Sequence, residues 1–148
     1  MTRATAIPTL LLLLAACSHA SAGDRVLVRI RTGTDTVTVV AGVADTDPER
    51  RAGLSGRTRL APAEGMAFLF HRPVRVGFWM KDTRIPLSIA FWGPAGRIVS
   101  IMDMIPCHVD PCPSFRPAAA FVGALEVNRG FFRERGIDVG DRVEFGSA

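Results

Sequence analysis

The feature of the sequence that most constrains its fold is a succession of short apolar segments separated by turn residues. Residues 26–31 alternate apolar and charged side chains, which is typical of a strand with one buried face. Residues 93–96, Gly-Pro-Ala-Gly, have the composition of a hairpin turn. So many short segments predict a mostly β domain, with strands over residues 26–31, 36–43, 66–70, 74–80, 87–92, 97–104, 121–127 and 142–145.

Two short helices interrupt this pattern. Residues 45–49 combine a capping side chain, a proline at the first helical position and acidic residues in the first turn, which is typical of a helix start. Gly53 is expected to end this helix, and Leu54 to anchor it to the core. The second helix is expected over residues 130–135, with Asn128 as its cap.

The length and composition are those of one domain with a substantial core. The chain has 148 residues, of which 48% are hydrophobic and 22% charged. Extensive disorder is therefore excluded, and no second domain is expected. We predict an α+β, mostly β fold over residues 23–148, as a compact single domain that forms a small closed or partly closed β-barrel with two short helices.

Residues 1–22 have the pattern of an export signal followed by a tether. Arg3 supplies a positive start, and the apolar run at residues 7–16 is about half the ~20 residues that a membrane-spanning helix needs. The Leu-Ala-Ala-Cys sequence that ends at Cys17 resembles a bacterial lipobox, in which the cysteine is lipidated and tethers the protein to a membrane. Residues 20–22, Ala-Ser-Ala, offer an alternative cleavage site that would release a soluble secreted or periplasmic protein. We expect a lipid-anchored protein of the cell envelope.

Cys107 and Cys112 are the two cysteines that remain for the exported domain. Because an oxidising compartment favours disulfides, we expect these two residues to be joined. The loop that such a bond closes is short and contains Pro111, so its expected role is to fix a local loop shape.

The charge pattern argues against a nucleic-acid partner. The formal net charge is +4 and the isoelectric point about 9.8, yet the arginines alternate with acidic residues and form no basic stripe. A protein that follows a phosphate backbone needs such a stripe. We therefore expect no nucleic-acid binding.

Several segments resemble one known prokaryotic family in order and spacing. They are Glu-Gly-Met-Ala-Phe at residues 64–68, Phe-Trp-Met-Lys-Asp-Thr-Arg-Ile-Pro-Leu at 78–87, Pro-Cys and Cys-Pro at 106–107 and 112–113, Leu-Glu-Val at 125–127, Gly-Ile at 136–137 and Gly-Asp-Arg-Val at 140–143. Over about residues 43–145 the chain is similar to the family catalogued as domain of unknown function 192. The resemblance implies a compact, mostly β domain that is exported or lipid-anchored, and it brings no established activity. Asp82 stands where asparagine is usual in that family.

Lys81 is the candidate binding residue that stands out from the rest of the sequence. It is the one lysine among the 18 basic Lys and Arg residues. Because an ammonium and a guanidinium are not interchangeable, its retention suggests a site that takes only the smaller group. Trp79 is expected to share a strand face with it, and the remaining ligand-binding candidates are Asp82, Thr83 and Glu64. The structural alternative is that Lys81 pairs with Asp82 or Glu64 and closes the end of a strand.

Two acidic residues, Asp103 and Glu126, lie within apolar strand segments. Each faces outward, pairs with an arginine or lies in a cleft, and two buried carboxyl groups at close range would allow acid–base chemistry. Lys81, Asp103 and Glu126 are therefore weak catalytic candidates, and no catalytic residue is assigned.

Soft side chains suggest a further alternative, a copper-handling protein. Thioether, thiolate and imidazole groups suit Cu(I), but methionines in strands usually belong to the core, and Cys-x4-Cys is a poor zinc spacing. The residues concerned are Met66, Met80, Met102, Met104, His71, His108, Cys107 and Cys112. We expect no metal and no cofactor.

Together these observations predict an exported cell-envelope protein of unknown molecular activity. The favoured function is a binding module for a small molecule, a glycan or a protein partner, using the surface formed by residues 79–83. The first alternative is an envelope enzyme of unknown reaction that uses Lys81 with Asp103 or Glu126. The second alternative is copper handling.

Overall fold

The computed structural model describes residues 25–147, so the expected signal segment and Cys17 lie outside the described residues. In chain order its elements are β1 (Arg25–Arg31), β2 (Thr36–Ala44), α1 (Asp47–Ala52), β3 (Glu64–Val74), β4 (Phe78–Trp79), β5 (Leu87–Trp92), β6 (Ile98–Met104), β7 (Ser114–Phe115), β8 (Phe121–Asn128), α2 (Phe131–Glu134) and β9 (Arg142–Ser147).

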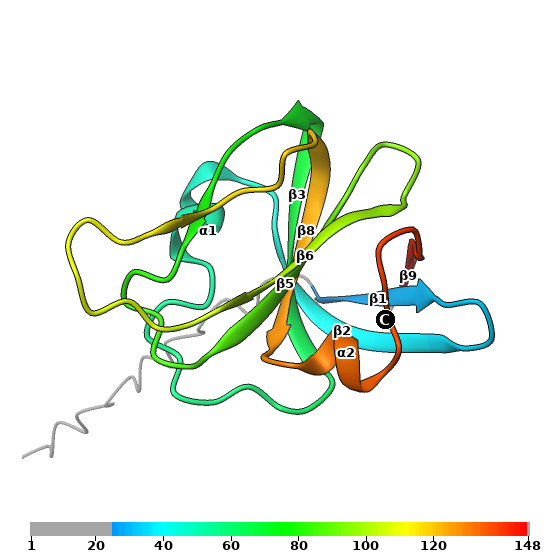
Figure 1. Ribbon diagram of the computed structural model, residues 1–148, viewed down its shortest axis with the longest axis horizontal. Coiled ribbons are helices and arrows are strands. Elements are labelled where there is room, and N and C mark those ends of the chain that lie inside the picture. The colour runs from blue at the N-terminus through cyan, green and yellow to red at the C-terminus, as the bar shows by residue number, and fades with distance from the viewer. Residues whose placement is uncertain (1–24, 148) are drawn as a thin grey trace, which may run out of the picture.

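Seven of the strands form one curled sheet in the order β6-β5-β8-β3-β2-β1-β9. The pairing of β2 with β3 is parallel, which the crossover through α1 and a loop makes possible, and the other pairings are antiparallel. The two edges meet at one end, where Arg97 and Arg142 form an antiparallel bridge and the Ile98 amide donates to the Asp141 carbonyl at 2.9 Å. The result is a half-barrel with two short helices (Figure 1), which confirms the predicted fold class.

The central strands bury both faces because each face packs against a separate apolar cluster. One cluster fills the inside of the curl and includes Leu125 and Phe132, and the other lies on the opposite face and includes Phe68 and Phe91. All six residues of β5 are buried for this reason. Figure 1 shows α1 and the loop that carries β7 on one side of the sheet, away from the β1, β2 and β9 strands.

Helix α1 begins where the sequence predicts. The Thr46 side chain accepts a hydrogen bond from the Glu49 amide, and the Glu49 carboxylate accepts from the Thr46 amide at 3.0 Å, which forms a capping box. Gly53 ends the helix, and the following Leu54 is 3% exposed and packs in the second cluster. Leu54 therefore anchors a helix that has no buried residue of its own.

The strand predicted over residues 74–80 is wrong. β3 extends to Val74, the chain then leaves the sheet, and Phe78 and Trp79 alone form β4, which pairs with β7. Gly77 permits this departure, since a Cβ atom at this position would clash with the Ser114 hydroxyl oxygen. The absence of a side chain thus lets the loop bearing β7 approach closely.

The predicted cap at Asn128 is also wrong. Its side-chain amide donates to the carbonyls of Leu60 and Ala61 at 3.0 and 3.1 Å, so Asn128 holds the loop before β3. Gly130, with φ of 85°, precedes α2 without a side-chain cap, and the short helix is held by the buried Phe131 and Phe132. Within residues 25–147 no helix has the length and apolar character needed to cross a membrane.

The close packing of β3 on β8 predicts a strong difference between two glycine substitutions. A Cβ atom at Gly65 would lie 2.5 Å from the Glu126 carbonyl oxygen, whereas a Cβ atom at Gly33 meets nothing within 4 Å. Gly65→Ala should lower the free energy of unfolding by about 1–3 kcal/mol or more, because backbone must move. Gly33→Ala should leave it nearly unchanged. Urea unfolding of both variants checks this, and equal midpoints would contradict the described packing.

Candidate functional site

A pocket of about 330 Å³ opens between α1, β3, β4 and β8. Its volume falls in the range of small-molecule sites, about 300–1,000 Å³. Its lining is aromatic and charged. The aromatic residues are Phe68, Phe70, Phe78 and Trp79, and the charged residues are Asp47, Arg50, Arg51, Lys81 and Glu126, with Thr83 beside them.

Glu126 forms the buried base of the pocket. It lies on the central strand β8, in register with Met66 on β3 and Ile89 on β5, and is 5% exposed. Burial raises the pKa of its carboxyl group to about 8, and no group within residues 25–147 offsets this loss of water by hydrogen bonding to it. At neutral pH this shift favours the protonated, neutral form of the carboxyl group.

The aromatic wall is fixed by contacts between rings. Phe78 packs edge-on against Phe68 and Phe91, with centroids 5.0 and 5.5 Å apart. Phe70 makes the same kind of contact with Phe121 at 5.5 Å. Because these rings are held by the core, the wall is formed before any ligand arrives.

Helix α1 supplies a charged rim. The Arg50 guanidinium donates to the Asp47 carboxylate at 2.5 Å and to the Leu69 carbonyl at 2.9 Å, and it lies 4.9 Å from the centroid of the Phe70 ring. The hydrogen bond from Arg50 lowers the pKa of Asp47. Arg50 and Asp47 thus neutralise each other, whereas Arg51 is exposed and forms no ion pair with the described residues.

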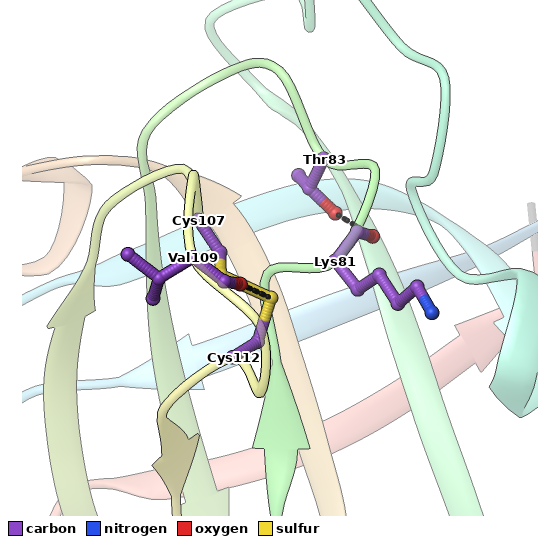
Figure 2. The surroundings of a disulfide bond; sticks show 5 residues. All are labelled: Lys81, Thr83, Cys107, Val109 and Cys112. Atoms are coloured by element: carbon purple, nitrogen blue, oxygen red, sulfur yellow. Dashed lines mark hydrogen bonds between the residues drawn. A yellow bond between two sulfur atoms is a disulfide. The ribbon is translucent and has the colours of Figure 1, made fainter.

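A tight turn places Lys81 at the rim opposite α1. The Thr83 amide donates to the Met80 carbonyl at 3.1 Å, and the Gly56 amide donates to the Asp82 carbonyl at 2.9 Å. Asp82 adopts a φ of 57°, a left-handed conformation that aspartate and asparagine tolerate better than most residues. Met80 is 1% exposed and fixes the turn in the core, which leaves the Lys81 side chain extended and exposed (Figure 2).

The disulfide joins Cys107 and Cys112, as the sequence predicts, and lies beside this turn. The Val109 carbonyl oxygen lies 3.0 Å from the Cys107 sulfur, inside the closed loop. β7 follows this loop directly, and its Ser114 pairs with Trp79. The covalent bond therefore constrains the segment that holds the Trp79 wall in place.

The structure brings together three of the five predicted ligand-binding candidates. Trp79, Lys81 and Thr83 line the pocket, although β4 ends at Trp79 and the predicted common strand face does not exist. Asp82 is exposed and contributes its main chain, while Glu64 pairs with Arg25 at 2.7 Å away from the pocket.

Lys81 joins neither candidate acid in an ion pair, and it pairs with neither Asp82 nor Glu64, among residues 25–147. The structural alternative, in which such a pair closes the end of a strand, is therefore not what the structure shows.

Asp103 lies on the opposite face of the sheet from Glu126. The register pairs Asp103 with Ser88, one residue from Ile89, which is the partner of Glu126. Because side chains alternate between faces, the two carboxyl groups point to opposite sides. The Ser88 hydroxyl donates to Asp103 at 2.5 Å and, with Arg129, lowers the pKa of Asp103. The structure does not bring Asp103 and Glu126 together as a catalytic pair.

The soft side chains considered for copper are dispersed. Met80 and Met104 are fully buried in the apolar cluster, Met66 and Met102 pack against it, and Cys107 and Cys112 are oxidised to a disulfide. His71 and His108 are exposed. Within the described part of the chain no three His, Cys, Asp or Glu side chains form a group that could hold a metal ion.

The family of the chain follows from its sequence match. Residues 28–145 match the model of the family DUF192, described as "Uncharacterized ACR". The chain belongs to the DUF192 family. This confirms the predicted resemblance and extends it from residue 43 back to residue 28, which brings β1 and β2 into the family domain.

Two solved structures are similar to this DUF192 chain over most of its length. A Sinorhizobium meliloti 1021 protein, described as a proposed transcription regulator, is 29% identical with a TM-score of 0.78, and the alignment covers 84% of this chain and 95% of that one. A Novosphingobium aromaticivorans protein of unknown function is 32% identical with a TM-score of 0.78, and the alignment covers 85% and 89% of the two chains. Among curated proteins no sequence matches this chain.

Sequence reasoning missed the wall that this DUF192 protein builds from β3 and α1. Phe68 and Phe70 alternate with Met66 on one face of β3, and Met66 is the register partner of Glu126. The period-two pattern could have placed these side chains together, but the pairing of β3 with β8 had first to be known. The contribution of Arg50 and Arg51 had no detectable pattern, because short helices carry charged residues on every exposed face.

The burial of Glu126 predicts a pH-dependent stability. Its pKa rises from 4.5 to about 8 on folding, so the folded state favours the protonated form, and stability is lost as pH rises through this window. Relative to Glu126→Gln, the parent protein should lose about 1.4 kcal/mol of unfolding free energy per pH unit at most. Urea unfolding of the parent and of Glu126→Gln at pH values between 4.5 and about 8 measures the difference. Glu134→Gln, on the exposed surface of α2, should run parallel to the parent at every pH, and parallel curves for Glu126→Gln would show that the carboxyl group is solvated.

Proposed function

We propose that this DUF192 protein is an envelope binding module that takes a small molecule into the pocket above Glu126. The observation that carries the proposal is the preformed concave site, in which Trp79, Lys81 and Thr83 meet a wall of phenylalanines over a buried carboxyl group. A pocket of about 330 Å³ suits a small molecule better than an extended glycan or a protein surface.

Binding is favoured over catalysis because the polar groups of the pocket are not coupled to one another. A general acid or base works within hydrogen-bond reach of its partner or substrate. Glu126 is unpartnered within the described chain, and Lys81 forms no ion pair there. An enzyme that uses Lys81 with Glu126 is the second candidate, since both line one pocket, and turnover of a bound ligand would identify it.

The role of transcription regulator, which is the description of the Sinorhizobium relative, gains no support from the charges of this chain. Several arginines are already paired with carboxylates: Arg25 with Glu64, Arg31 with Glu144 and Arg129 with Asp103. Such pairs reduce the positive field that a phosphate backbone requires.

Export and lipid anchoring complete the proposal. They rest on the Leu-Ala-Ala-Cys sequence at Cys17, and the Cys107–Cys112 disulfide suits an oxidising compartment. A lipid at Cys17 would hold the pocket close to a membrane surface, where it could capture molecules that pass through the envelope.

The anchor is tested by Cys17→Ala, compared with Ser18→Ala, in cells that express the full chain. The cysteine variant should move from the membrane fraction to the soluble fraction, because the acyl attachment site is lost. The serine variant should remain in the membrane fraction. Unchanged partitioning of Cys17→Ala would refute lipidation at this residue.

The binding function is tested with a fragment library of cationic, anionic, zwitterionic and neutral molecules, read out by amide chemical shifts. Fragments that bind should shift the amide signals of residues around the pocket. The double variant Trp79→Ala with Lys81→Ala should weaken fragment binding by roughly tenfold or more, because an aromatic anchor and a charge are removed. The matched control is Val139→Ala with Arg116→Ala, an exposed apolar residue and an exposed cation outside the pocket. A library in which no charge class perturbs the pocket would end the proposal.

A further inference from the structure

The Glu126 carboxyl group forms no hydrogen bond with the described residues, and its oxygens keep access to the pocket, since no fully buried side-chain oxygen or nitrogen in residues 25–147 lacks a partner. Polar atoms at the floor of a pocket are normally hydrogen-bonded to the protein, to water or to a ligand, and the described chain offers the Glu126 oxygens no donor. Its register neighbours, Met66 and Ile89, supply no donor, and Thr83 directs its hydroxyl to the Lys81 carbonyl at 3.5 Å. The base of the pocket is therefore built to receive a polar group of a ligand.

We propose, building on the binding function above, that the ligand is a small zwitterion whose ammonium group is seated on Glu126 and whose anionic group meets Lys81 at the rim.

The walls of the pocket favour a cation at its base. Phe68, Phe78 and Trp79 line the pocket with aromatic rings, and the face of an aromatic ring attracts an organic cation. A carboxylate below these rings adds the opposite charge, and a buried ion pair is stable only when both members are present. A ligand ammonium would satisfy the acid and the rings at once, whereas a ligand carbonyl would satisfy the acid alone.

The rim favours an anion. Arg50 is already neutralised by Asp47, but Lys81 and Arg51 are exposed and unpaired among the described residues. A ligand that carried only positive charge would be repelled by these two cations as it entered. A ligand that carried only negative charge could accept a hydrogen bond from protonated Glu126, but it would leave the aromatic rings without a cation, so opposite charges at the two ends of one molecule fit the site best.

Seating the ammonium should release a proton from Glu126. The titratable groups that line the same pocket are Asp47, Arg50 and Arg51 from α1 and Lys81 after β4, whereas the register neighbours of Glu126 on β3 and β5 do not titrate. Since burial raises its pKa to about 8, Glu126 favours its protonated form at neutral pH, and a ligand ammonium would favour its ionised form. Affinity for the ammonium should therefore increase with pH, by up to about tenfold per unit below that value.

Two matched series of probes test the inference by calorimetry on the folded domain. The aromatic series is phenylalanine, phenethylamine and 3-phenylpropionate, and the aliphatic series is leucine, 3-methylbutylamine and 4-methylpentanoate. In at least one series the zwitterion should bind most tightly, the amine next and the anion least. Binding of the zwitterion and the amine should release a proton, which appears as a dependence of the heat on the ionisation enthalpy of the buffer.

Three variants separate the two ends of the ligand. Glu126→Gln should weaken binding of the zwitterion and of the amine by roughly tenfold or more and abolish proton release. It should not weaken binding of the anion. Lys81→Ala should weaken binding of the zwitterion severalfold, and the amine should bind with the same affinity or more tightly. Glu134→Gln, outside the pocket, should change none of these values, and thermal unfolding shows that each variant is folded.

The possible failures are distinct. Tightest binding by the anion, an amine that is insensitive to Glu126→Gln, or no binding in either series while other fragments occupy the pocket would overturn the zwitterion inference and leave the binding function intact. A pocket that no fragment of any charge enters would overturn both.

Discussion

The structure depends on the burial of both faces of the central strand β8. Leu125 and Val127 fill the inside of the half-barrel, while Ala124 and Glu126 point into the second layer formed by α1, β4 and β7. A strand in this position reads as almost continuously apolar, so a single carboxyl group within it is energetically costly. The fold tolerates that cost only because the second layer leaves a pocket above the carboxyl group.

The division into two faces also separates chemical roles within the domain. Asp103 faces Ser88 and the arginines around α2, where it forms a network of hydrogen bonds and ion pairs that needs no ligand. Glu126, on the other face, has no such network within the described chain. Asp103 and Glu126 look equivalent in the sequence, but their surroundings differ because their partners on β5, Ser88 and Ile89, are one residue apart and therefore lie on opposite faces of the sheet.

Local patterns in the sequence predicted much of the fold. The capping box before α1, the strand over residues 87–92 and the Cys107–Cys112 disulfide are all short-range features, and each is present. The strand expected over residues 74–80 and the cap at Asn128 failed because long-range partners decided both of them: β7 pairs with β4, and the loop before β3 takes the Asn128 amide. The site was predictable in part for the same reason. Trp79, Lys81 and Thr83 are close in sequence, whereas the contributions of Phe68, Arg50 and Glu126 require the order of the strands.

The turn at Asp82 links the two halves of the pocket entrance through the main chain. The Asp82 carbonyl accepts a hydrogen bond from the amide of Gly56, in the segment after α1. Few residue types other than glycine, asparagine and aspartate adopt the left-handed backbone conformation of Asp82. The choice of residue at this position is therefore dictated by conformation. An exchange between aspartate and asparagine at residue 82 during evolution would preserve the shape of the pocket entrance, so it would not indicate that the ligand had changed.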